Sequence, residues 1–437
     1  MQEWAKREDR KPLVLRGARQ VGKTSAVELL SKEFDQFVHL NLDRAEDRKP
    51  FHGLTDIHDL AQAVFLLKNK TLTSGKALLF IDEIQEEPLA IERLRYFYED
   101  LPDLHVICAG SLLETVLDHK VNIPVGRAEY MVVRPVSFRE FLEATGETAA
   151  LSAFDTVPTP SFAHAKLLKL FHTYTFTGGM PEVVAKYAEH RDFTRLTSVY
   201  ESLIVSYLDD VEKYARSTHQ REVIRHAIRS MFFDAGTRIR FEGFGRSNYK
   251  SREMGEALRA LEKAMLLRLV YPTTDVKVPF KPDRRKSPKL FALDTGLVNY
   301  FAGLQPGLIG TQDLNAEYQG RVAEHIVAQE ILASSFNVID RLSFWVREEK
   351  HSTAEVDFVR AHGNDLIPVE VKSGSAGHMR SLQQFMNRSS GNLAVRLCRD
   401  PIGIEQVSTV AGKTYRLLNL PYYLVSQLDA YLERSRQ

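Results

Sequence analysis

The sequence predicts an α/β protein built around a parallel sheet, and three patterns along the chain carry this prediction. In about the first 145 residues, short apolar runs alternate with helical patterns, which is typical of a parallel sheet with helices on both faces. From Ser161 to about Ala235, long amphipathic helices replace the strands. The last hundred or so residues return to mixed strands and helices. A chain of 437 residues is long enough for two or three such domains.

The strands of the first part are short apolar runs bounded by Gly, Pro or charged residues. We expect them at residues 12–17, 37–42, 77–82, 104–110 and 128–135. Helical patterns at 25–34 and 56–70 lie between them. The parallel sheet is therefore expected to end before residue 150.

The rest of the chain divides by the same reasoning. Residues 163–176 and 194–215 read as helices, and 251–270 as a further helix followed by a basic turn at 278–289 and a strand at 289–294. A helix at 317–333 precedes strands near 342–348, 354–361 and 366–373. The expected parts are 1–150 (the parallel sheet), 151–235 (helical), 236–300 (a small basic unit) and 301–437 (mixed α/β).

Composition excludes several classes of protein. Hydrophobic residues make up 44% and charged residues 26% of the chain, as in an ordinary globular protein. Lys plus Arg number 58 and Asp plus Glu 57, which excludes a uniformly basic coat for nucleic acid but leaves room for a local basic patch. The cysteines, Cys108 and Cys398, both lie in apolar runs and cannot build a disulfide framework or a Cys-based zinc site.

The N-terminal residues are charged rather than apolar, so they do not resemble a signal peptide. All apolar runs are shorter than the roughly 18 residues of a membrane span. These two observations predict a cytoplasmic protein without a membrane partner.

The strongest functional motif is a glycine-rich loop. Residues 17–24 read G-x-x-x-x-G-K-T directly after a predicted strand and before a predicted helix, which is the context of a phosphate-binding P-loop. The glycines let backbone N–H groups face a phosphate, and the helix N-terminus adds a favourable dipole. Lys23 is expected to contact the β- and γ-phosphates of ATP, and Thr24 to hold Mg²⁺.

A second motif lies sixty residues further on, where an apolar strand ends in Asp82 and Glu83. In P-loop enzymes such an Asp helps to hold Mg²⁺. The Glu that follows is well placed to orient or deprotonate the attacking water, which favours a hydrolase over a kinase. The two motifs together predict Mg²⁺-dependent ATP hydrolysis.

Three further residues are candidates for the same site. Ser111 follows the strand at 104–110, where it could sense the γ-phosphate or hold the lytic water; equally, it could cap the next helix. Arg127 and Arg134 flank the fifth strand, and an arginine supplied by a neighbouring subunit can accelerate hydrolysis. We prefer Arg127 for this role, the alternative for both arginines being an ordinary surface position.

The C-terminal part holds a second candidate site. Asp357 lies in one predicted strand, and Glu370 and Lys372 lie in the next, two residues apart and so on one face. Two carboxylates can hold Mg²⁺ or Mn²⁺ beside a lysine, and this D…E-x-K spacing resembles that of restriction-endonuclease-like nucleases, which often add a Glu such as Glu324 from an earlier helix. The alternative is a surface ion pair with Lys372, contributing about 0–1 kcal/mol.

A cluster of basic residues spans positions 246–289. It combines the predicted helix at 251–270 with the turn that follows it, as in a winged helix whose helix enters a DNA groove and whose wing contacts phosphates. The alternative is a solvated charged face. Its basic members are Arg246, Lys250, Arg252, Arg259, Lys263, Lys277, Lys281, Arg284, Arg285, Lys286 and Lys289.

Together these motifs resemble the bacterial and archaeal AAA-type ATPases whose C-terminal half is a domain of unknown function, DUF4143. The matching segments are 17–24, 80–85, 109–111, 126–130, 134–142, 177–182, 293–297, 355–358 and 369–373. The resemblance covers nearly the whole chain with the motifs in order. It implies an AAA-type core, a helical lid, a winged-helix-like unit and a restriction-endonuclease-like end.

Our interpretation is a Mg²⁺-dependent ATPase whose turnover moves its other domains, acting on or near DNA as a homo-oligomer. The alternatives are an ATP-gated, metal-dependent nuclease and a nucleotide-switched signalling or scaffold protein. The proposed catalytic residues are Lys23, Glu83, Arg127 and Ser111. The nucleotide-binding residues are Gly17, Ala18, Arg19, Gln20, Val21, Gly22, Lys23, Thr24 and Ser25. Thr24 and Asp82 would hold the Mg²⁺ of ATP, and Glu324, Asp357 and Glu370, beside Lys372, would hold a second Mg²⁺ or Mn²⁺.

Overall fold

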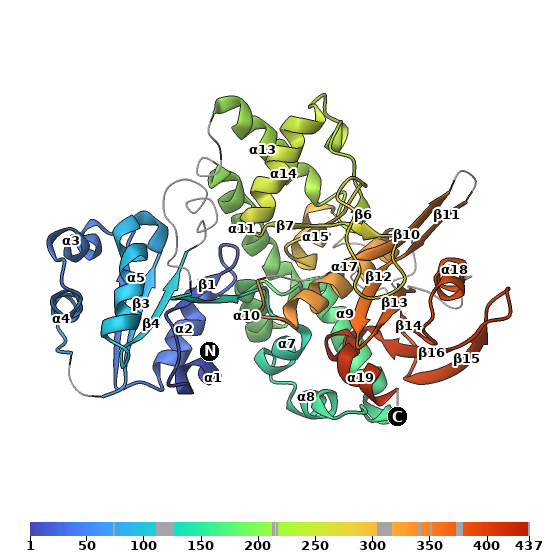
Figure 1. Ribbon diagram of the computed structural model, residues 1–437, viewed down its shortest axis with the longest axis horizontal. Helices are drawn as coiled ribbons and strands as arrows, with labels where there is room; N and C mark the ends of the chain where they lie inside the picture. Colours follow the sequence, from blue (N-terminus) through green and yellow to red (C-terminus); the bar gives the residue numbers. More distant parts are fainter. Residues whose placement is uncertain are drawn as a thin grey trace. The chain divides into compact units, whose positions relative to one another are not determined.

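The computed structural model describes residues 1–72, 75–110, 126–211, 215, 217–303, 317–338, 342–349, 352–372 and 379–435 (Figure 1). Their contacts divide the chain into two compact units, of which the first is essentially Met1–Arg134 and the second holds most of the rest. Each unit is described by itself. None of the helices in these ranges has the length and apolar character that a membrane crossing requires.

The first unit is a five-stranded parallel sheet in the order β2-β3-β4-β1-β5, which confirms the predicted fold class. Its strands are β1 (Leu13–Arg16), β2 (Gln36–Asn41), β3 (Ala77–Asp82), β4 (His105–Ala109) and β5 (Glu129–Val132). The helices are α1 (Gln2–Lys6), α2 (Lys23–Ser31), α3 (Ala45–Gly53), α4 (Ile57–Leu67) and α5 (Pro88–Asp100).

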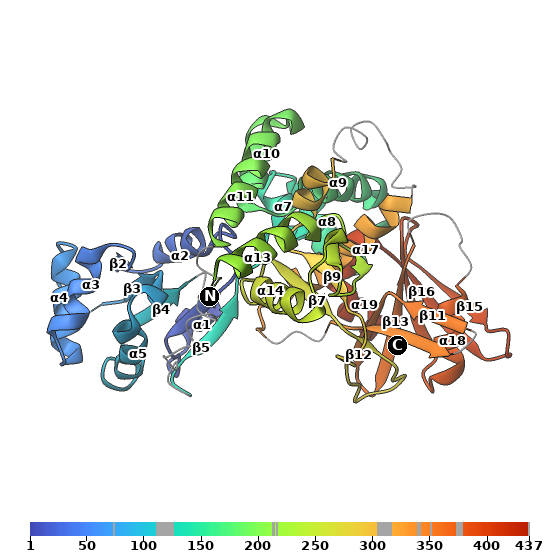
Figure 2. The same cartoon turned by 90° about the horizontal axis from the view of Figure 1, so that it is seen from above.

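Helices cover both faces of this sheet because its strands are apolar on both sides. Leu13 and Leu15 of β1 point to one face and pack with Val27 of α2, whereas Val14 points to the other and belongs to the cluster around α3, α4 and α5. Figure 2 shows α2 and α5 on opposite sides of β3 and β4. All parallel strands therefore present their carboxyl ends at one edge, where loops can build a site.

The second unit begins with helices. They are α7 (Phe138–Ala144), α8 (Thr148–Asp155), α9 (His164–Thr177), α10 (Pro181–His190), α11 (Thr197–Asp209) and α13 (Thr218–Met231). A Ser137–Glu140 capping box starts α7, and the rings of Phe138, Phe171 and Tyr174 pack together between α7 and α9. This segment is helical, as the sequence predicts.

A small three-stranded antiparallel sheet follows, in the order β6-β9-β7. It comprises β6 (Thr237–Arg238), β7 (Leu267–Val270) and β9 (Lys289–Ala292), with α14 (Ser251–Lys263) before β7 and α15 (Thr295–Phe301) after β9. The prediction of one helix over 251–270 was wrong at its end. Residues 267–270 form a strand instead, because pairing with β9 buries Leu267 and Leu269.

The C-terminal part is again mixed α/β. A five-stranded sheet in the order β12-β13-β14-β16-β15 lies beside the smaller sheet β11-β10-β8. The strands are β8 (Pro272–Thr273), β10 (Phe344–Glu349), β11 (Ser352–Val356), β12 (Phe358–His362), β13 (Asp365–Val371), β14 (Leu393–Cys398), β15 (Gly403–Ser408) and β16 (Thr414–Pro421). The helices are α17 (Glu317–Ala333), α18 (Arg380–Arg388) and α19 (Leu428–Arg434).

The single strand expected at 354–361 is divided in two. β11 ends at Val356 and pairs with β10, whereas β12 begins at Phe358 and pairs with β13. Asp357 therefore occupies the break, where the chain passes from one sheet to the other. The segment from Phe358 onward forms an antiparallel hairpin, β12–β13, with the strand of Glu370.

Candidate nucleotide site and buried carboxylate cluster

The glycine-rich loop joins β1 to α2 in a conformation that its sequence makes accessible. Gly17 and Gly22 have φ values of 151° and 89°, and the non-glycine Gln20 between them has 62°. A Cβ atom at Gly17 would lie 2.3 Å from the Val133 carbonyl oxygen, so only glycine allows this approach. The loop therefore depends on glycine here and leads directly into the N-terminus of α2.

Lys23, the first residue of α2, is folded back into the loop. Its Nζ donates hydrogen bonds to the carbonyl oxygens of Gly17 (2.9 Å) and Ala18 (2.8 Å), and the residue is 9% exposed. Burial lowers the pKa of its ammonium to about 8, while the carboxylates of Glu83 and Asp82 act in the opposite direction. The ammonium is thus held inside the loop, next to the acids that follow β3.

Asp82 ends β3 and joins this loop from the neighbouring part of the sheet. Thr24 Oγ1 donates to Asp82 Oδ2 at 2.9 Å, and His39 Nε2 lies 3.7 Å from the same oxygen. Burial alone would raise the pKa of Asp82, but the contacts with His39, Thr24 and the Glu83 backbone N–H hold it below its ordinary value. The carboxylate is therefore kept ionised beside the threonine hydroxyl.

Glu83 follows in a left-handed backbone conformation, with φ 52° and ψ 45°. This conformation is uncommon for a residue other than glycine and is often found at functional sites. Gln85, which is 7% exposed, donates from Nε2 to Glu83 Oε2 at 2.5 Å. Sequence analysis missed Gln85, although its position two residues after the acid was visible.

These residues fit a nucleotide with its Mg²⁺. A threonine hydroxyl and an ionised carboxylate are oxygen ligands of the kind that Mg²⁺ prefers. Hydrogen bonds to two loop carbonyls hold the Lys23 ammonium near the N-terminus of α2. Phosphate oxygens bind at the helix N-terminus in such loops, so the ammonium lies close to where they would be. Two observations support this fit: the oxygen atoms that Thr24 and Asp82 offer to Mg²⁺, and the glycines that let the loop curve around a phosphate.

The structure does not bring every predicted residue to the carboxyl ends of the strands, where the P-loop lies. Arg127 precedes β5, which runs parallel to β1, so it lies at the amino end of the strands, opposite the P-loop. Its Nε donates to Glu99 at 2.6 Å. Arg134 follows the carboxyl end of β5 and so lies on the P-loop edge. Ser111 lies outside the described residues.

A second group of charged side chains is buried in the C-terminal part. Lys289, the first residue of β9, is 2% exposed, and its Nζ lies 2.8 Å from Glu324, 2.8 Å from Glu355 and 3.5 Å from Asp357. Burial would lower the pKa of this ammonium, but the acids around it raise it above its ordinary value. Sequence analysis had placed Lys289 in the basic DNA-facing cluster, and its burial corrects that assignment.

The remaining predicted residues of this site complete the group. Asp357 Oδ2 accepts a hydrogen bond from the Val371 backbone N–H at 2.8 Å, and continuing the β12–β13 register sets Asp357 beside Glu370. Lys372 Nζ lies 2.8 Å from Glu370 Oε1. Burial and the nearby charge of Asp357 raise the pKa of both Glu324 and Glu370. The spacing that suggested a common site therefore does gather these side chains.

Two glycine-containing motifs, which carried the family resemblance without a stated role, meet in a buried junction. Gly179 donates its N–H to Asp294 Oδ2 at 2.6 Å, and a Cβ atom at Gly178 would lie 2.2 Å from Asp294 Oδ1.

Glu330 of α17 is another buried acid, and it packs against the helices α7 and α9. It accepts hydrogen bonds from the Phe138 N–H (2.9 Å) and the Tyr174 hydroxyl (2.8 Å). Burial raises the pKa of Asp294 to about 6 and that of Glu330 to about 7.

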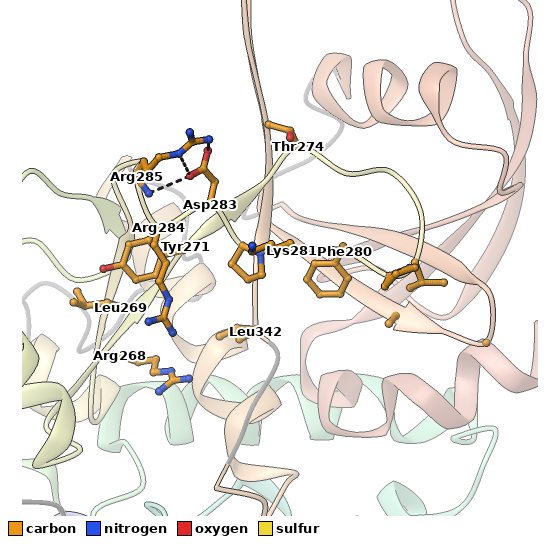
Figure 3. Close-up of a pocket in the computed structure, with 15 residues that line it drawn as sticks. Arg268, Leu269, Tyr271, Thr274, Phe280, Lys281, Asp283, Arg284, Arg285 and Leu342 are labelled. Atoms are coloured by element: carbon orange, nitrogen blue, oxygen red, sulfur yellow. Dashed lines mark hydrogen bonds and ion pairs between the residues drawn. The ribbon is translucent and has the colours of Figure 1, made fainter. Parts of the chain in front are cut away.

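The exposed part of the predicted basic cluster borders a cavity of about 1220 Å³. Figure 3 shows the guanidinium of Arg284 next to the ring of Tyr271, and the two are 6.0 Å apart. Arg285 is paired with Asp283 at 2.9 Å, although its side chain is 90% exposed. We call this cavity the basic groove; its charged lining residues are Arg268, Lys281, Asp283, Arg284 and Arg285.

Sequence models of three known domains match consecutive parts of the chain. The AAA domain matches residues 9–142, a domain of unknown function (DUF8612) matches residues 168–307, and another (DUF4143) matches residues 319–411. No curated protein matches the sequence.

Three solved archaeal structures are similar over most of their lengths. The Walker-type ATPase of Pyrococcus abyssi is 16% identical with a TM-score of 0.42, the match covering 67% of this chain and 91% of that one. Cdc6p of Pyrobaculum aerophilum is 11% identical with a TM-score of 0.23, covering 68% and 87%. ORC2 of Aeropyrum pernix in its ADP form is 11% identical with a TM-score of 0.26, covering 69% and 89%. These TM-scores are too low for the three structures to inform the function of this chain.

Proposed function

We propose that the chain, in which an AAA domain matches residues 9–142 and a DUF4143 domain matches residues 319–411, hydrolyses ATP with Mg²⁺ and couples turnover to movement of its other parts. One observation carries the proposal. Lys23 and Thr24 at the start of α2 lie next to Asp82 and Glu83 at the end of β3. The Thr24 hydroxyl donates a hydrogen bond to Asp82. The coupling is motivated by the order of the domains along the chain.

In this proposal each side chain has a separate task. The backbone N–H groups of the loop and the N-terminus of α2 bind the phosphates, and Lys23 exchanges its loop carbonyls for phosphate oxygens. Thr24 and Asp82 would hold Mg²⁺, which when bound neutralises charge on the phosphate oxygens. The Glu83 carboxylate accepts the proton of the attacking water, and Gln85 holds that carboxylate in position.

ATP turnover by two variants tests this proposal. Lys23→Ala should lose ATP binding, because it removes the ammonium that the loop holds in place. Glu83→Gln should still bind ATP but turn over about 10²–10⁴-fold more slowly, since the general base is gone. Glu86→Gln changes an exposed acid three residues away and should behave like the wild type. Wild-type turnover in Glu83→Gln would overturn the assignment of the base.

DNA is the partner we assign to the basic groove. The groove combines exposed guanidinium and ammonium groups with the aromatic ring of Tyr271, and such surfaces bind the phosphates and bases of nucleic acids. Within this groove Lys281 and Arg284 are exposed, whereas Arg285 already has an acidic partner in Asp283. Lys281 and Arg284 are therefore the side chains to test.

The double charge reversal Lys281→Glu with Arg284→Glu should weaken DNA binding and reduce its dependence on salt, because fewer counterions are released. Arg195→Glu, which reverses an exposed charge on another element, serves as the control. A shallow salt dependence of wild-type binding would contradict DNA as the partner and favour a protein instead. The ATPase assay with and without DNA separates this question from hydrolysis itself.

We do not extend the proposal to nuclease activity or to a second metal ion. The residues predicted for that site lie together, but Lys289 already contacts three of the acids in the group. Incubation of DNA with Mn²⁺, comparing the wild type with Asp357→Ala, tests for nuclease activity directly. Cleavage by the wild type that the variant lacks would restore the nuclease alternative.

A further inference from the structure

The buried carboxylate cluster consists of Glu324, Glu355, Asp357 and Glu370 together with Lys289 and Lys372. Its acids come from α17, from β11 and the break that follows it, and from β13. The D…E-x-K spacing implies that such a group holds a divalent metal ion between its carboxylates. Whether this group can do so depends on what already lies between them.

An ammonium already lies at the centre of these acids. Lys289 Nζ contacts Glu324 and Glu355 at 2.8 Å each and Asp357 at 3.5 Å, and its side chain is 3% exposed. The two distances of 2.8 Å are those of charge-assisted hydrogen bonds, and the contact with Asp357 is a longer ion pair. In the described parts of the chain, no group of three or more acidic, histidine or cysteine side chains is arranged to hold a metal ion. The acids of this cluster are arranged around a lysine instead.

The backbone fixes Lys289 in this place. Lys289 pairs with Arg238 of β6 on one side and with Val270 of β7 on the other, so it lies in the central strand of its sheet. Its Nζ also lies 5.1 Å from the ring of Phe344, which closes part of the site with apolar surface. The ammonium can leave the cluster only by rotating its stem out of a packed interior.

The other lysine of the group is engaged as well. Lys372, which the spacing assigns to catalysis, lies 2.8 Å from Glu370 Oε1. Lys289 contacts three of the acids and Lys372 contacts the fourth, so every carboxyl group of the cluster has an ammonium partner. Removing one of these partners would leave buried charge without compensation, which is strongly destabilising.

We infer that the Lys289 ammonium is the resident cation of this cluster and occupies the position that a nuclease with this spacing gives to a divalent metal ion. The cluster is then an ion-pair junction that ties β9 to α17 and to the segment around Asp357. It does not bind Mg²⁺ or Mn²⁺ in the wild-type chain. This inference is independent of the proposed ATPase activity.

Mn²⁺ binding to the full-length, nucleotide-free protein tests the inference, with bound Mn²⁺ counted by electron paramagnetic resonance and stability followed by thermal melting. Every variant carries Asp82→Asn, so that the P-loop edge contributes little. Lys289→Met keeps the length of the stem but removes the charge. Lys286→Met is the matched control, because Lys286 lies three residues away and pairs with Glu348 at the surface.

The parent protein carries Asp82→Asn alone. It should bind no Mn²⁺ that is lost when Asp357→Asn is added. Lys289→Met should melt several degrees lower without metal, because the acids lose their ammonium partner. It should gain one Mn²⁺ per chain and regain stability when this ion binds. Adding Asp357→Asn should abolish the new Mn²⁺ site. Lys286→Met should behave like the parent.

Two results would overturn the inference. One is a Mn²⁺ ion in the parent that Asp357→Asn abolishes, an outcome that can be observed even if Lys289→Met does not fold. The other is a folded Lys289→Met protein that gains no Mn²⁺ site, since the cluster would then be no latent cation site.

Discussion

The amide of Gln85 donates a hydrogen bond of 2.5 Å to the carboxylate of Glu83, two residues before it in the same turn. Glu83 has a left-handed backbone, and the 3₁₀ turn that follows it brings the two side chains together. Gln85 is 7% exposed, and its Oε1 has no hydrogen-bond partner among the described residues. The amide therefore acts mainly on Glu83.

We predict that Gln85→Ala lowers kcat by about 10- to 100-fold, because the freed carboxylate no longer faces the attacking water in one orientation. The KM for ATP should change little, since the loop and Lys23 are intact. Gln85→Glu should be at least as slow, because it sets a second carboxylate against the first. Steady-state ATPase kinetics measure both values. A KM change with unchanged kcat would contradict a positioning role.

The hydrogen bond from Thr24 to Asp82 leads to a second prediction. Asp82→Asn keeps the shape of the side chain but removes the charge that would hold Mg²⁺. Wild-type affinity for ATP should increase on adding Mg²⁺, and in Asp82→Asn most of this increase should disappear. Calorimetric titration with and without Mg²⁺ measures the difference. Asp43→Asn, an exposed acid just after β2, is the control.

Arg127 can act on ATP only from a neighbouring copy, because it lies at the opposite end of the strands from its own P-loop. We predict that Arg127→Ala and Lys23→Ala are each inactive alone and that mixing them restores ATPase activity. In the mixture, an intact P-loop meets an intact arginine. A mixture of Arg127→Ala with Lys23→Ala/Arg127→Ala should stay inactive. Full activity of Arg127→Ala alone would show that the arginine is an ordinary surface residue paired with Glu99.

The parts of the candidate nucleotide site could be predicted largely from sequence because they are local. The glycine spacing, the strand before it and the acids that end β3 are each written in a short segment. The five-stranded parallel sheet follows from the alternation of apolar runs and helices. Local patterns do not show how a side chain is turned, so the Gln85–Glu83 contact, which depends on a left-handed backbone, was missed.

The carboxylate cluster shows the opposite limit. The spacing of Asp357 and Glu370 correctly suggested that they lie together, since they flank one hairpin. Lys289 comes from a strand 68 residues earlier than Asp357, and only the tertiary fold brings its ammonium among the acids. From sequence it looked like one more member of a basic turn. The sequence did offer one sign that Lys289 is buried: three apolar residues follow it directly in the same strand.

The buried Glu330 predicts how stability depends on pH. Its carboxyl group faces the Tyr174 hydroxyl and the Phe138 N–H, with Glu140 of α7 as the nearby acid that also raises its pKa. The folded protein holds this proton up to a pKa of about 7, against an ordinary value of 4.5. The folded state therefore binds more protons than the unfolded state between these values, and the stability that this proton supplies is lost as pH rises through about 7.

Glu330→Gln removes this titration but keeps the hydrogen bonds. The amide oxygen can still accept from Phe138 and Tyr174, and the amide nitrogen takes the place of Oε2, which has no partner among the described residues. We expect the variant to be more stable than the wild type at pH 8 by about 1–3 kcal/mol and to lose less stability between pH values of about 5 and 7. The other buried acids whose pKa values are raised, Asp294, Glu324 and Glu370, contribute to the slope that remains.

Thermal melting across this pH range measures the effect. The control is Glu143→Gln, which changes an exposed acid on α7 whose side chain is 68% accessible. It should follow the wild-type profile, because it leaves Glu330 and its hydrogen-bond partners unchanged. If Glu330→Gln instead loses stability at every pH by the same amount, the carboxylate is ionised in the folded protein. Its charge, rather than its proton, would then be what the Tyr174 hydroxyl stabilises.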